Sequence, residues 1–220
     1  MTGRPPTVNA YVLAELRKSI ATGGLPPGRQ VRQDALAEEL SVSRVPIREA
    51  LKILEGEGLV SYEPHRGYFV TKLSLGDLRE VYRIRELLEA EAITEGTPKL
   101  SGADIERLTD LSGDIERCAV AEDIAGMTTA NRQFHFTLFG ASAMPRLIRL
   151  LRVLWDATDA YRSLYYTEPG NRDRVCAEHT AMIAAARSGD ADAVVRLAAT
   201  HRVAAVQALA AVVGITTAQS

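Results

Sequence analysis

The sequence predicts a mainly α-helical protein made of an N-terminal winged helix-turn-helix and a C-terminal all-α bundle of six helices. Two short helical patterns separated by a tight turn are followed by two short strand patterns, which form a small β-wing. Strand signals are absent after residue 72, and glycine- and proline-containing breaks divide the remainder into six helical segments. We therefore expect a first domain over residues 1–72, a linker over 73–77, a helical domain over 78–213 and a flexible tail over 214–220.

The first element is a helix over residues 8–22. Its apolar side chains recur at helical spacing on one face, at Val12, Leu16 and Ile20. A glycine pair ends this helix, and Leu25-Pro26-Pro27-Gly28 predicts a turn before a short extended segment at Gln30-Val31.

The next two helices are separated only by Ser41-Val42. The first covers residues 34–40, and the second begins after Ser43, a residue type that favours helix N-caps. The second helix has an apolar face at Ile47, Ala50, Leu51 and Leu54 and a basic stripe at Arg44, Arg48 and Lys52. This stripe is either a solvated charged face or the base-reading surface of a recognition helix, and the helix-turn-helix context favours recognition.

Two strands follow the recognition helix, over residues 59–62 and 68–71. The turn between them contains His65, Arg66 and Gly67, so the tip of this wing is basic. Residues 1–72 contain 10 Lys and Arg and 8 Asp and Glu, whereas the remainder contains 16 and 20. The positive charge is therefore concentrated where the sequence predicts a DNA-binding surface, although the whole chain has a net charge of −2.

Several classes of protein are disfavoured. The two cysteines, Cys118 and Cys176, form no C-x-x-C motif and are expected to be free thiols in a reducing cytoplasm. The N-terminus lacks the apolar run of a signal peptide, and the most apolar stretch, 203–214, is shorter than a membrane span. Nucleotide-binding and serine-hydrolase motifs are absent from the sequence. We expect a cytoplasmic protein that does not interact with membranes.

The six C-terminal helices are expected over residues 75–95, 101–120, 122–141, 144–166, 170–187 and 190–212. Asn131 and His135 are four residues apart and share a helix face. His179 precedes Gly189 by 10 residues and His201 follows it by 12, so an antiparallel hairpin turning at Gly189 brings the two rings to the same level. Any one of these histidines alone is more simply a packing or surface residue. The set predicts a site for a divalent transition metal, with zinc and nickel as the leading candidates.

Candidate effector-binding residues lie on two of these helices. Arg85 is suited to bind a small carboxylate through two hydrogen bonds. The alternative interpretation is that Arg85 forms a surface ion pair with Glu89. Tyr161 and Arg162 are further candidates, whereas Trp155 and Tyr165 are expected to be packing residues.

Five motifs of the N-terminal half closely resemble the GntR family of bacterial transcription regulators. They are Leu25-Pro26-Pro27-Gly28, Leu36-Ala37-Glu38, the segment from Val42 to Leu51, Glu57-Gly58-Leu59-Val60 and Gly67-Tyr68-Phe69-Val70. The resemblance implies that Arg44 and Arg48 contact the operator, with Ser43 and Val45 beside them, and that Gly67 and the wing tip face the minor groove. Many members have an arginine where this chain has Asp34, and Arg32 is the candidate to replace it.

The C-terminal half resembles the FCD effector domain of FadR-type GntR regulators, in its shorter, VanR-like, six-helix branch. The motifs are Asn131-Arg132-Gln133-Phe134-His135, Glu178-His179, Gly189-Asp190 and His201. The resemblance implies metal ligation by Asn131 and the three histidines. Because all four ligands are neutral, the charge of the ion is uncompensated, which favours a small carboxylate as the effector.

The resulting hypothesis is a homodimeric, ligand-responsive transcription regulator that binds an inverted-repeat DNA operator as a repressor. One alternative is a regulator for which the metal itself is the effector, and another is a metalloenzyme. The metalloenzyme is disfavoured because Glu178, about 100° around the helix from His179, is expected to point away from the site.

Overall fold

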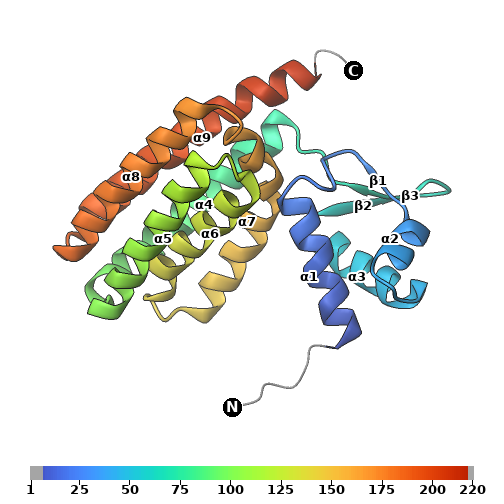
Figure 1. Cartoon of the computed structure of the whole chain (residues 1–220), viewed down its shortest axis with the longest axis horizontal. Coiled ribbons are helices and arrows are strands. Elements are labelled where there is room, and N and C mark those ends of the chain that lie inside the picture. Colours follow the sequence, from blue (N-terminus) through green and yellow to red (C-terminus); the bar gives the residue numbers. More distant parts are fainter. Residues whose placement is uncertain (1–6, 218–220) are drawn as a thin grey trace. The chain divides into compact units, whose positions relative to one another are not determined.

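The computed structural model describes residues 7–217 (Figure 1). Its internal contacts divide the chain into two compact units, whose main boundary lies between Leu73 and Ser74, with Asp156–Ala160 grouped with the first unit. This boundary lies within the linker expected from the sequence.

The N-terminal unit is a winged helix-turn-helix. Its elements are α1 (Val8–Ala21), β1 (Gln30–Val31), α2 (Gln33–Glu39), α3 (Arg44–Gly56), β2 (Val60–Glu63) and β3 (Gly67–Val70). The three strands form an antiparallel sheet in the order β1-β3-β2, so the extended segment at Gln30 is the third strand beside the wing. Val60 pairs with Val70, and Glu63 pairs with Gly67 at the tip.

The apolar faces predicted for the N-terminal helices form the core of this unit. Val12, Leu16 and Ile20 of α1 are buried together with the four apolar residues of α3 and with side chains of the sheet. Ser43 occupies the N-cap position of α3, but its side chain makes no capping hydrogen bond. The start of α3 therefore agrees with the sequence, whereas the hydroxyl is not used as predicted.

The C-terminal unit contains the six predicted helices. They are α4 (Leu75–Gly96), α5 (Gly102–Val120), α6 (Ile124–Gly140), α7 (Pro145–Tyr165), α8 (Pro169–Arg187) and α9 (Ala191–Thr217), with a short 3₁₀ helix at Thr97–Lys99. Capping boxes at Ser74 and Ser101 begin α4 and α5. The beginning of α4 falls inside the range expected for the linker. Residues 214–217, expected as flexible tail, belong to α9, and residues 218–220 lie outside the described part.

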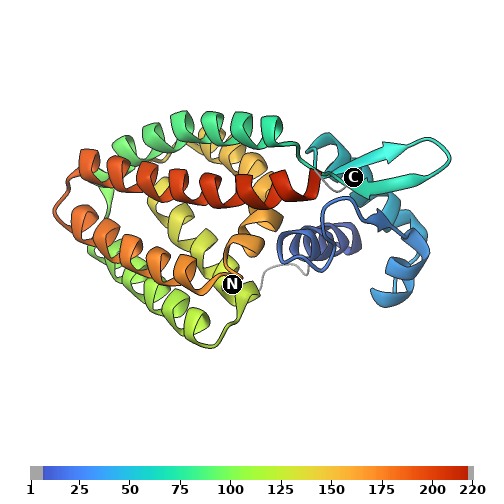
Figure 2. The ribbon, with the colours of Figure 1, turned by 90° about the horizontal axis from the view of Figure 1, so that it is seen from above.

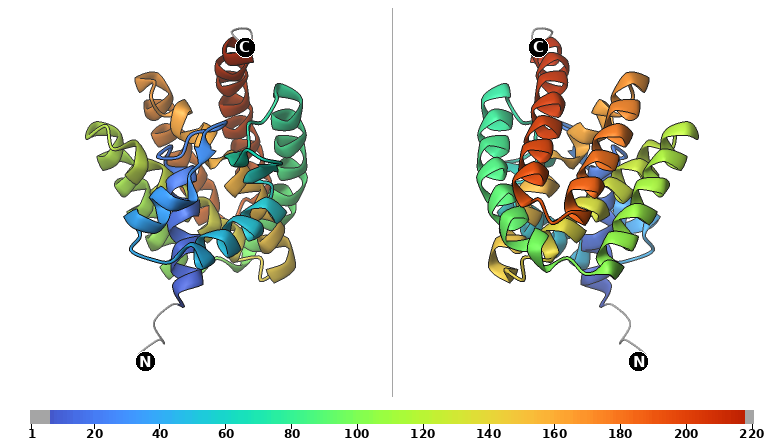
Figure 3. Two further views of the ribbon diagram at one scale, coloured as in Figure 1. Left: turned by 90° about the vertical axis from the view of Figure 1, so that its right-hand side faces the viewer. Right: turned by 90° about the vertical axis from the view of Figure 1, so that its left-hand side faces the viewer.

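Two features of the bundle position the site. The helices α8 and α9 run antiparallel side by side, and they turn at Gly189, whose φ of +73° favours glycine (Figures 2 and 3). The helix α6 packs against α4 and α5, and eight of its residues are buried, among them Asn131 and His135. Within the described residues, no helix has the length and apolar character needed to cross a membrane.

Candidate functional site

The basic stripe of α3 is exposed. Arg44, Arg48 and Lys52 have side-chain exposures of 72%, 58% and 57%, and the side chain of Val45 between them is also exposed. Because Ile47 on the same helix is fully buried, the helix separates a core face from a charged outer face. Exposure of this kind is what a helix inserted into a major groove requires.

The outer face of α3 also carries acidic partners. Asp34 of α2 forms an ion pair with Arg44, and Glu49 lies 3.3 Å from Nζ of Lys52. Asp34 is the residue that departs from the family pattern, and the structure shows that it engages an operator-contact candidate. Arg32, the proposed replacement, is exposed at the N-cap of α2.

The wing tip presents its basic residues outward. His65 and Arg66 are exposed, and Gly67 and His65 both have positive φ angles, of +89° and +64°. The Arg66 guanidinium lies 4.9 Å from the Phe69 ring centroid, and the Arg66 carbonyl accepts a 2.6 Å hydrogen bond from Gln30. The same guanidinium also forms an ion pair with Glu63, while the Arg66 side chain remains exposed.

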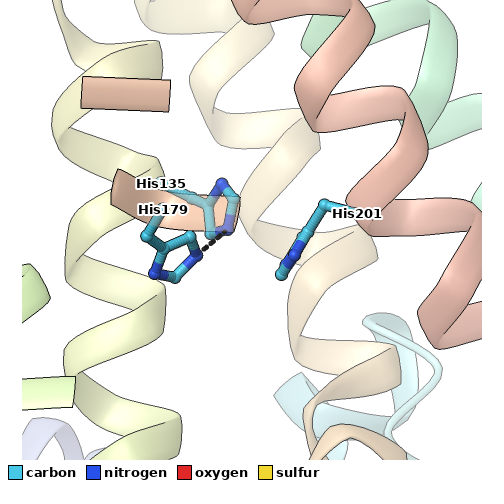
Figure 4. Close-up of side chains that lie close together, drawn as sticks. All are labelled: His135, His179 and His201. Atoms are coloured by element: carbon cyan, nitrogen blue, oxygen red, sulfur yellow. Dashed lines mark hydrogen bonds between the residues drawn. The ribbon is translucent and has the colours of Figure 1, made fainter. Parts of the chain in front are cut away.

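The second cluster lies inside the C-terminal unit. His135 from α6, His179 from α8 and His201 from α9 converge, and one potential ligand atom from each lies within 4.8 Å of the others (Figure 4). The Nε2 atoms of His135 and His179 are 3.3 Å apart. The antiparallel hairpin proposed from the spacing around Gly189 is therefore present and brings His179 and His201 together, and α6 adds His135 to the cluster.

Burial keeps two of these imidazoles neutral. The pKa of His135 lies well below its usual value, first because of burial and then because of His179 and His201. Burial likewise lowers the pKa of His179 well below the usual value, with His201 as the second cause. Since only the neutral imidazole coordinates a metal, both residues are in the binding-competent form near neutral pH.

Asn131 fits the same cluster. It lies one helical turn before His135 and is fully buried, yet neither atom of its side-chain amide has a hydrogen-bond partner among the described residues. The Nδ1 atom of His179 is likewise buried without a partner. An unsatisfied buried polar group costs about 1–3 kcal/mol, and a cation bound by the cluster would satisfy the amide oxygen of Asn131. The residues present therefore fit a metal with nitrogen and oxygen ligands.

The predicted orientation of Glu178 is wrong. Its Oε2 atom lies 2.6 Å from Nδ1 of His201, and both side chains are mostly buried. The prediction treated the face of His179 as the only inward face of α8. In the bundle, α8 packs against both α5 and α9, so two neighbouring faces are covered and Glu178 meets α9.

Arg85 is neither a surface ion-pair residue nor a guanidinium held only for a ligand. Its Nε lies 2.9 Å from Glu89, and both side chains are buried. Glu89 also accepts a 2.8 Å hydrogen bond from Trp155 Nε1 and forms an ion pair with Arg202 of α9. Burial raises the pKa of the Glu89 carboxyl, but Arg85 and Arg202 outweigh that effect and hold the pKa below its usual range.

This buried network borders a cavity of about 20 Å³ next to the histidines. Arg85, Arg162 and Arg202 line it together with His135 and His201. Trp155 lies between two guanidiniums, 4.3 Å from that of Arg85 and 3.9 Å from that of Arg162. Its indole thus packs as predicted but also lines the cavity, whereas Tyr161 is buried and does not line it. Sequence reasoning missed Arg202, whose only signal was its position next to His201.

Comparison with known proteins gives the family. Residues 9–70 match the model described as bacterial regulatory proteins, gntR family, and residues 80–204 match the FCD domain. The uncharacterized HTH-type transcriptional regulator YdhC of Bacillus subtilis is 33% identical over 170 residues, which cover 75% of this chain and 74% of that protein. The gluconate operon transcriptional repressor of the same organism is 36% identical over 134 residues, covering 59% and 53%.

A solved structure and a third sequence comparison agree. The HTH-type transcriptional regulator McbR of Escherichia coli is 29% identical over 156 residues, 70% of this chain and 71% of that protein. The structure described as E. coli McbR/YncC matches with a TM-score of 0.86 at 24% identity, covering 93% of this chain and 97% of the other, which shows a shared fold. These relatives are transcription regulators and not enzymes. The chain belongs to the GntR family of bacterial regulatory proteins and carries an FCD domain as its C-terminal unit.

Proposed function

We propose that this transcription regulator is controlled by a small carboxylate effector, which binds at a divalent metal held in the FCD domain. The observation that carries the proposal is the convergence of three histidines from three helices beside an arginine-lined cavity. Asn131, His135, His179 and His201 would hold the ion, with zinc and nickel as the first candidates. When bound, the metal supplies a concentrated positive charge for an anionic ligand.

The cavity chemistry supports an anionic effector. Three guanidiniums and one carboxylate, Glu89, border the cavity, so its described lining is positively charged even before an ion is added. Its volume is close to that of one water molecule, so entry of a carboxylate requires side chains to move. Arg85 and Arg162 are the proposed partners of the carboxylate, with Tyr161 as a more distant candidate.

A helix that lines the cavity is joined to the DNA-binding unit by a short stretch of chain, so a rearrangement at the cavity can affect that unit. Arg85 and Glu89 lie on α4, and only residues 71–74 separate the start of α4 from the end of β3. An effector that binds one arrangement of α4 more tightly than another shifts the population of domain arrangements towards the one it prefers. The size of the shift is set by the difference between the two affinities. We propose repression with release by effector, because one relative is named as a repressor.

The effector hypothesis is tested by titrating small carboxylates into a complex of metal-loaded protein and an operator selected from random duplex DNA. We expect a subset of mono- and dicarboxylates to change operator affinity in the wild type, and Arg85→Lys to weaken that response because it loses the bidentate fork. Arg83→Lys is the matched control, since Arg83 lies on the same helix but is exposed and paired with Glu86. No response of the wild type to any carboxylate would reject this effector class.

The same experiment separates the second candidate, a regulator that senses the metal itself. The identical histidine cluster supports this function. If operator affinity follows metal content and is unchanged by carboxylates at constant metal, the ion is the effector. The metalloenzyme alternative is set aside because the family consists of transcription regulators, not because of the orientation of Glu178.

We also propose that the protein is a homodimer that binds an inverted repeat. One winged helix offers a small DNA interface, and two-fold dimers solve this by reading two half-sites. Exposed apolar side chains lie on α4, at Ile84 and Leu87, and on α7, at Leu150 and Val153. Arg85 of α4 contacts Trp155 of α7, so the two helices are neighbours, and we propose that their exposed apolar side chains form the interface.

The dimer is expected to scatter light as a particle of twice the 23.9 kDa chain mass at micromolar concentration. Leu87→Glu is expected to shift the protein towards monomer, because a buried unpaired charge in an interface is strongly unfavourable. Val120→Glu is the control, because Val120 is exposed at the end of α5. A wild-type monomer that occupies single half-sites would contradict the proposal.

A further inference from the structure

We infer that Glu178 is a positioning residue for the metal site, which orients His201 and supplies negative charge that Asn131 does not. The inference rests on the proposed metal-binding function. Glu178 contacts His201, a candidate metal ligand, and is not itself proposed to bind the ion.

The first step is the tautomer of the His201 ring. Its Nδ1 atom lies 2.6 Å from the Glu178 carboxylate, and an ionised carboxylate only accepts hydrogen bonds. The geometry therefore favours the tautomer in which Nδ1 carries a proton and donates it to Glu178, and in the neutral ring this tautomer leaves Nε2 with a free lone pair. In this tautomer the nitrogen available to an ion is Nε2, the same atom type by which His135 and His179 approach each other.

The second step is the position of the ring. The His201 ring centroid lies 5.1 Å from that of His135 and 5.2 Å from that of His179, and its ring faces them across the site (Figure 4). Glu178 immediately precedes His179 on α8. One turn of α8 thus provides His179 as a candidate ligand and holds the ring of His201 through the Glu178 carboxylate. The α8–α9 hairpin therefore fixes two of the three histidine rings.

The third step is charge. Three imidazoles and an amide are neutral ligands, and the adjacent cavity keeps a net positive charge because three guanidiniums but only one carboxylate, that of Glu89, border it. This surrounding disfavours a dication by electrostatic repulsion. Glu178 lies one hydrogen bond away from the proposed coordination sphere, and a carboxylate bonded to Nδ1–H increases the basicity of the opposite nitrogen. We therefore assign to Glu178 the compensation that an aspartate in place of Asn131 would provide directly.

The test measures metal affinity by chelator competition in metal-stripped full-length protein. Loss of such a hydrogen-bonding partner typically weakens metal binding about 10- to 100-fold, and we expect Glu178→Gln to fall in this range. The glutamine oxygen can still accept a hydrogen bond from Nδ1–H, so this variant isolates the charge, whereas Glu178→Ala removes both contributions and should weaken binding at least as much. Asp173→Asn is the matched control, since it removes one negative charge from an exposed position of the same helix. We expect its affinity to stay within about twofold of the wild type, because a solvent-screened charge contributes little.

Two further measurements distinguish positioning from a purely structural role. The melting temperature of the stripped Glu178→Gln protein should stay close to that of the stripped wild type, while its Co²⁺ absorption spectrum should change because the ligand field of His201 changes. Asn131→Asp combined with Glu178→Gln restores the total charge and should recover much of the lost affinity.

The inference is overturned if Glu178→Gln and Glu178→Ala bind metal as tightly as the wild type while His135→Ala does not. It is also overturned if their weaker binding is matched by a lower melting temperature of the stripped proteins with an unchanged Co²⁺ spectrum. A wild type that binds no divalent ion rejects the proposed metal site together with this inference.

Discussion

Replacing both Arg44 and Arg48 with alanine is expected to abolish operator selectivity. The two residues lie one turn apart at the start of α3, and both are exposed on the face opposite the core. If each makes a bidentate contact with guanine, each substitution costs about 1–3 kcal/mol per half-site, and a dimer loses this at both half-sites. The measurement is a titration of selected operator and scrambled DNA at one fixed salt concentration, since affinities at different salt cannot be compared.

Lys52→Ala provides the contrast for this experiment. Lys52 lies further along the same stripe and is expected to contact phosphate, so its loss should weaken all sequences alike and reduce the salt dependence by about one counterion. Stability should be unaffected in both variants, because the three side chains bury no core surface. Wild-type selectivity in the double arginine variant would show that another surface reads the operator.

Removing the metal is expected to lower the melting temperature, and His179→Ala is expected to remove the response to metal. Because the candidate ligands come from three helices, a bound ion crosslinks α6, α8 and α9. Binding to the folded state alone stabilises by about 2.7 kcal/mol at a hundredfold excess over the dissociation constant. Calorimetric titration of stripped wild type, His135→Ala and His179→Ala with Zn²⁺ and Ni²⁺ measures the effect. Equal heats from all three proteins would show that these histidines only pack.

The stripped protein should also lose stability on acidification. His135 and His179 have folded-state pKa values well below the usual value, so the unfolded chain binds protons that the folded chain does not. Their contribution is therefore fully present above a pH of about 6.5 and is lost progressively as the pH falls below it. Acid should release a bound metal in the same direction, because a protonated imidazole cannot coordinate. Melting curves recorded between neutral and acidic pH test this, and a melting temperature independent of pH would contradict it.

The order and type of the elements were predictable from the sequence because they depend on interactions between residues close in the chain. The apolar faces of α1 and α3, the turn before Ser43 and the capping residues of α4 and α5 are local signals. The first five helices of the C-terminal unit begin and end within two residues of the predicted positions. The last helix was predicted to end at residue 212, but α9 continues to Thr217.

The histidine cluster was predictable for a related reason. An antiparallel hairpin has one geometric variable, the position of its turn, and Gly189 marked that position. Equal distances from the turn then brought His179 and His201 level without any knowledge of the remaining helices. The helical period placed Asn131 and His135 on one face of α6, and the packing of α6 in the bundle brings His135 to the other two histidines.

By itself, the sequence determined the winged helix, the exposed basic stripe, the six helices and the identity of the converging histidines. Only the tertiary structure decided which side chains surround that cluster. Glu178 reaches His201 because α8 is covered on two faces, and Glu89 is shared by Arg85, Arg202 and Trp155 because α4 meets both α7 and α9. Helical periodicity places a residue on a face, but the neighbour that this face meets depends on the packing of the whole bundle.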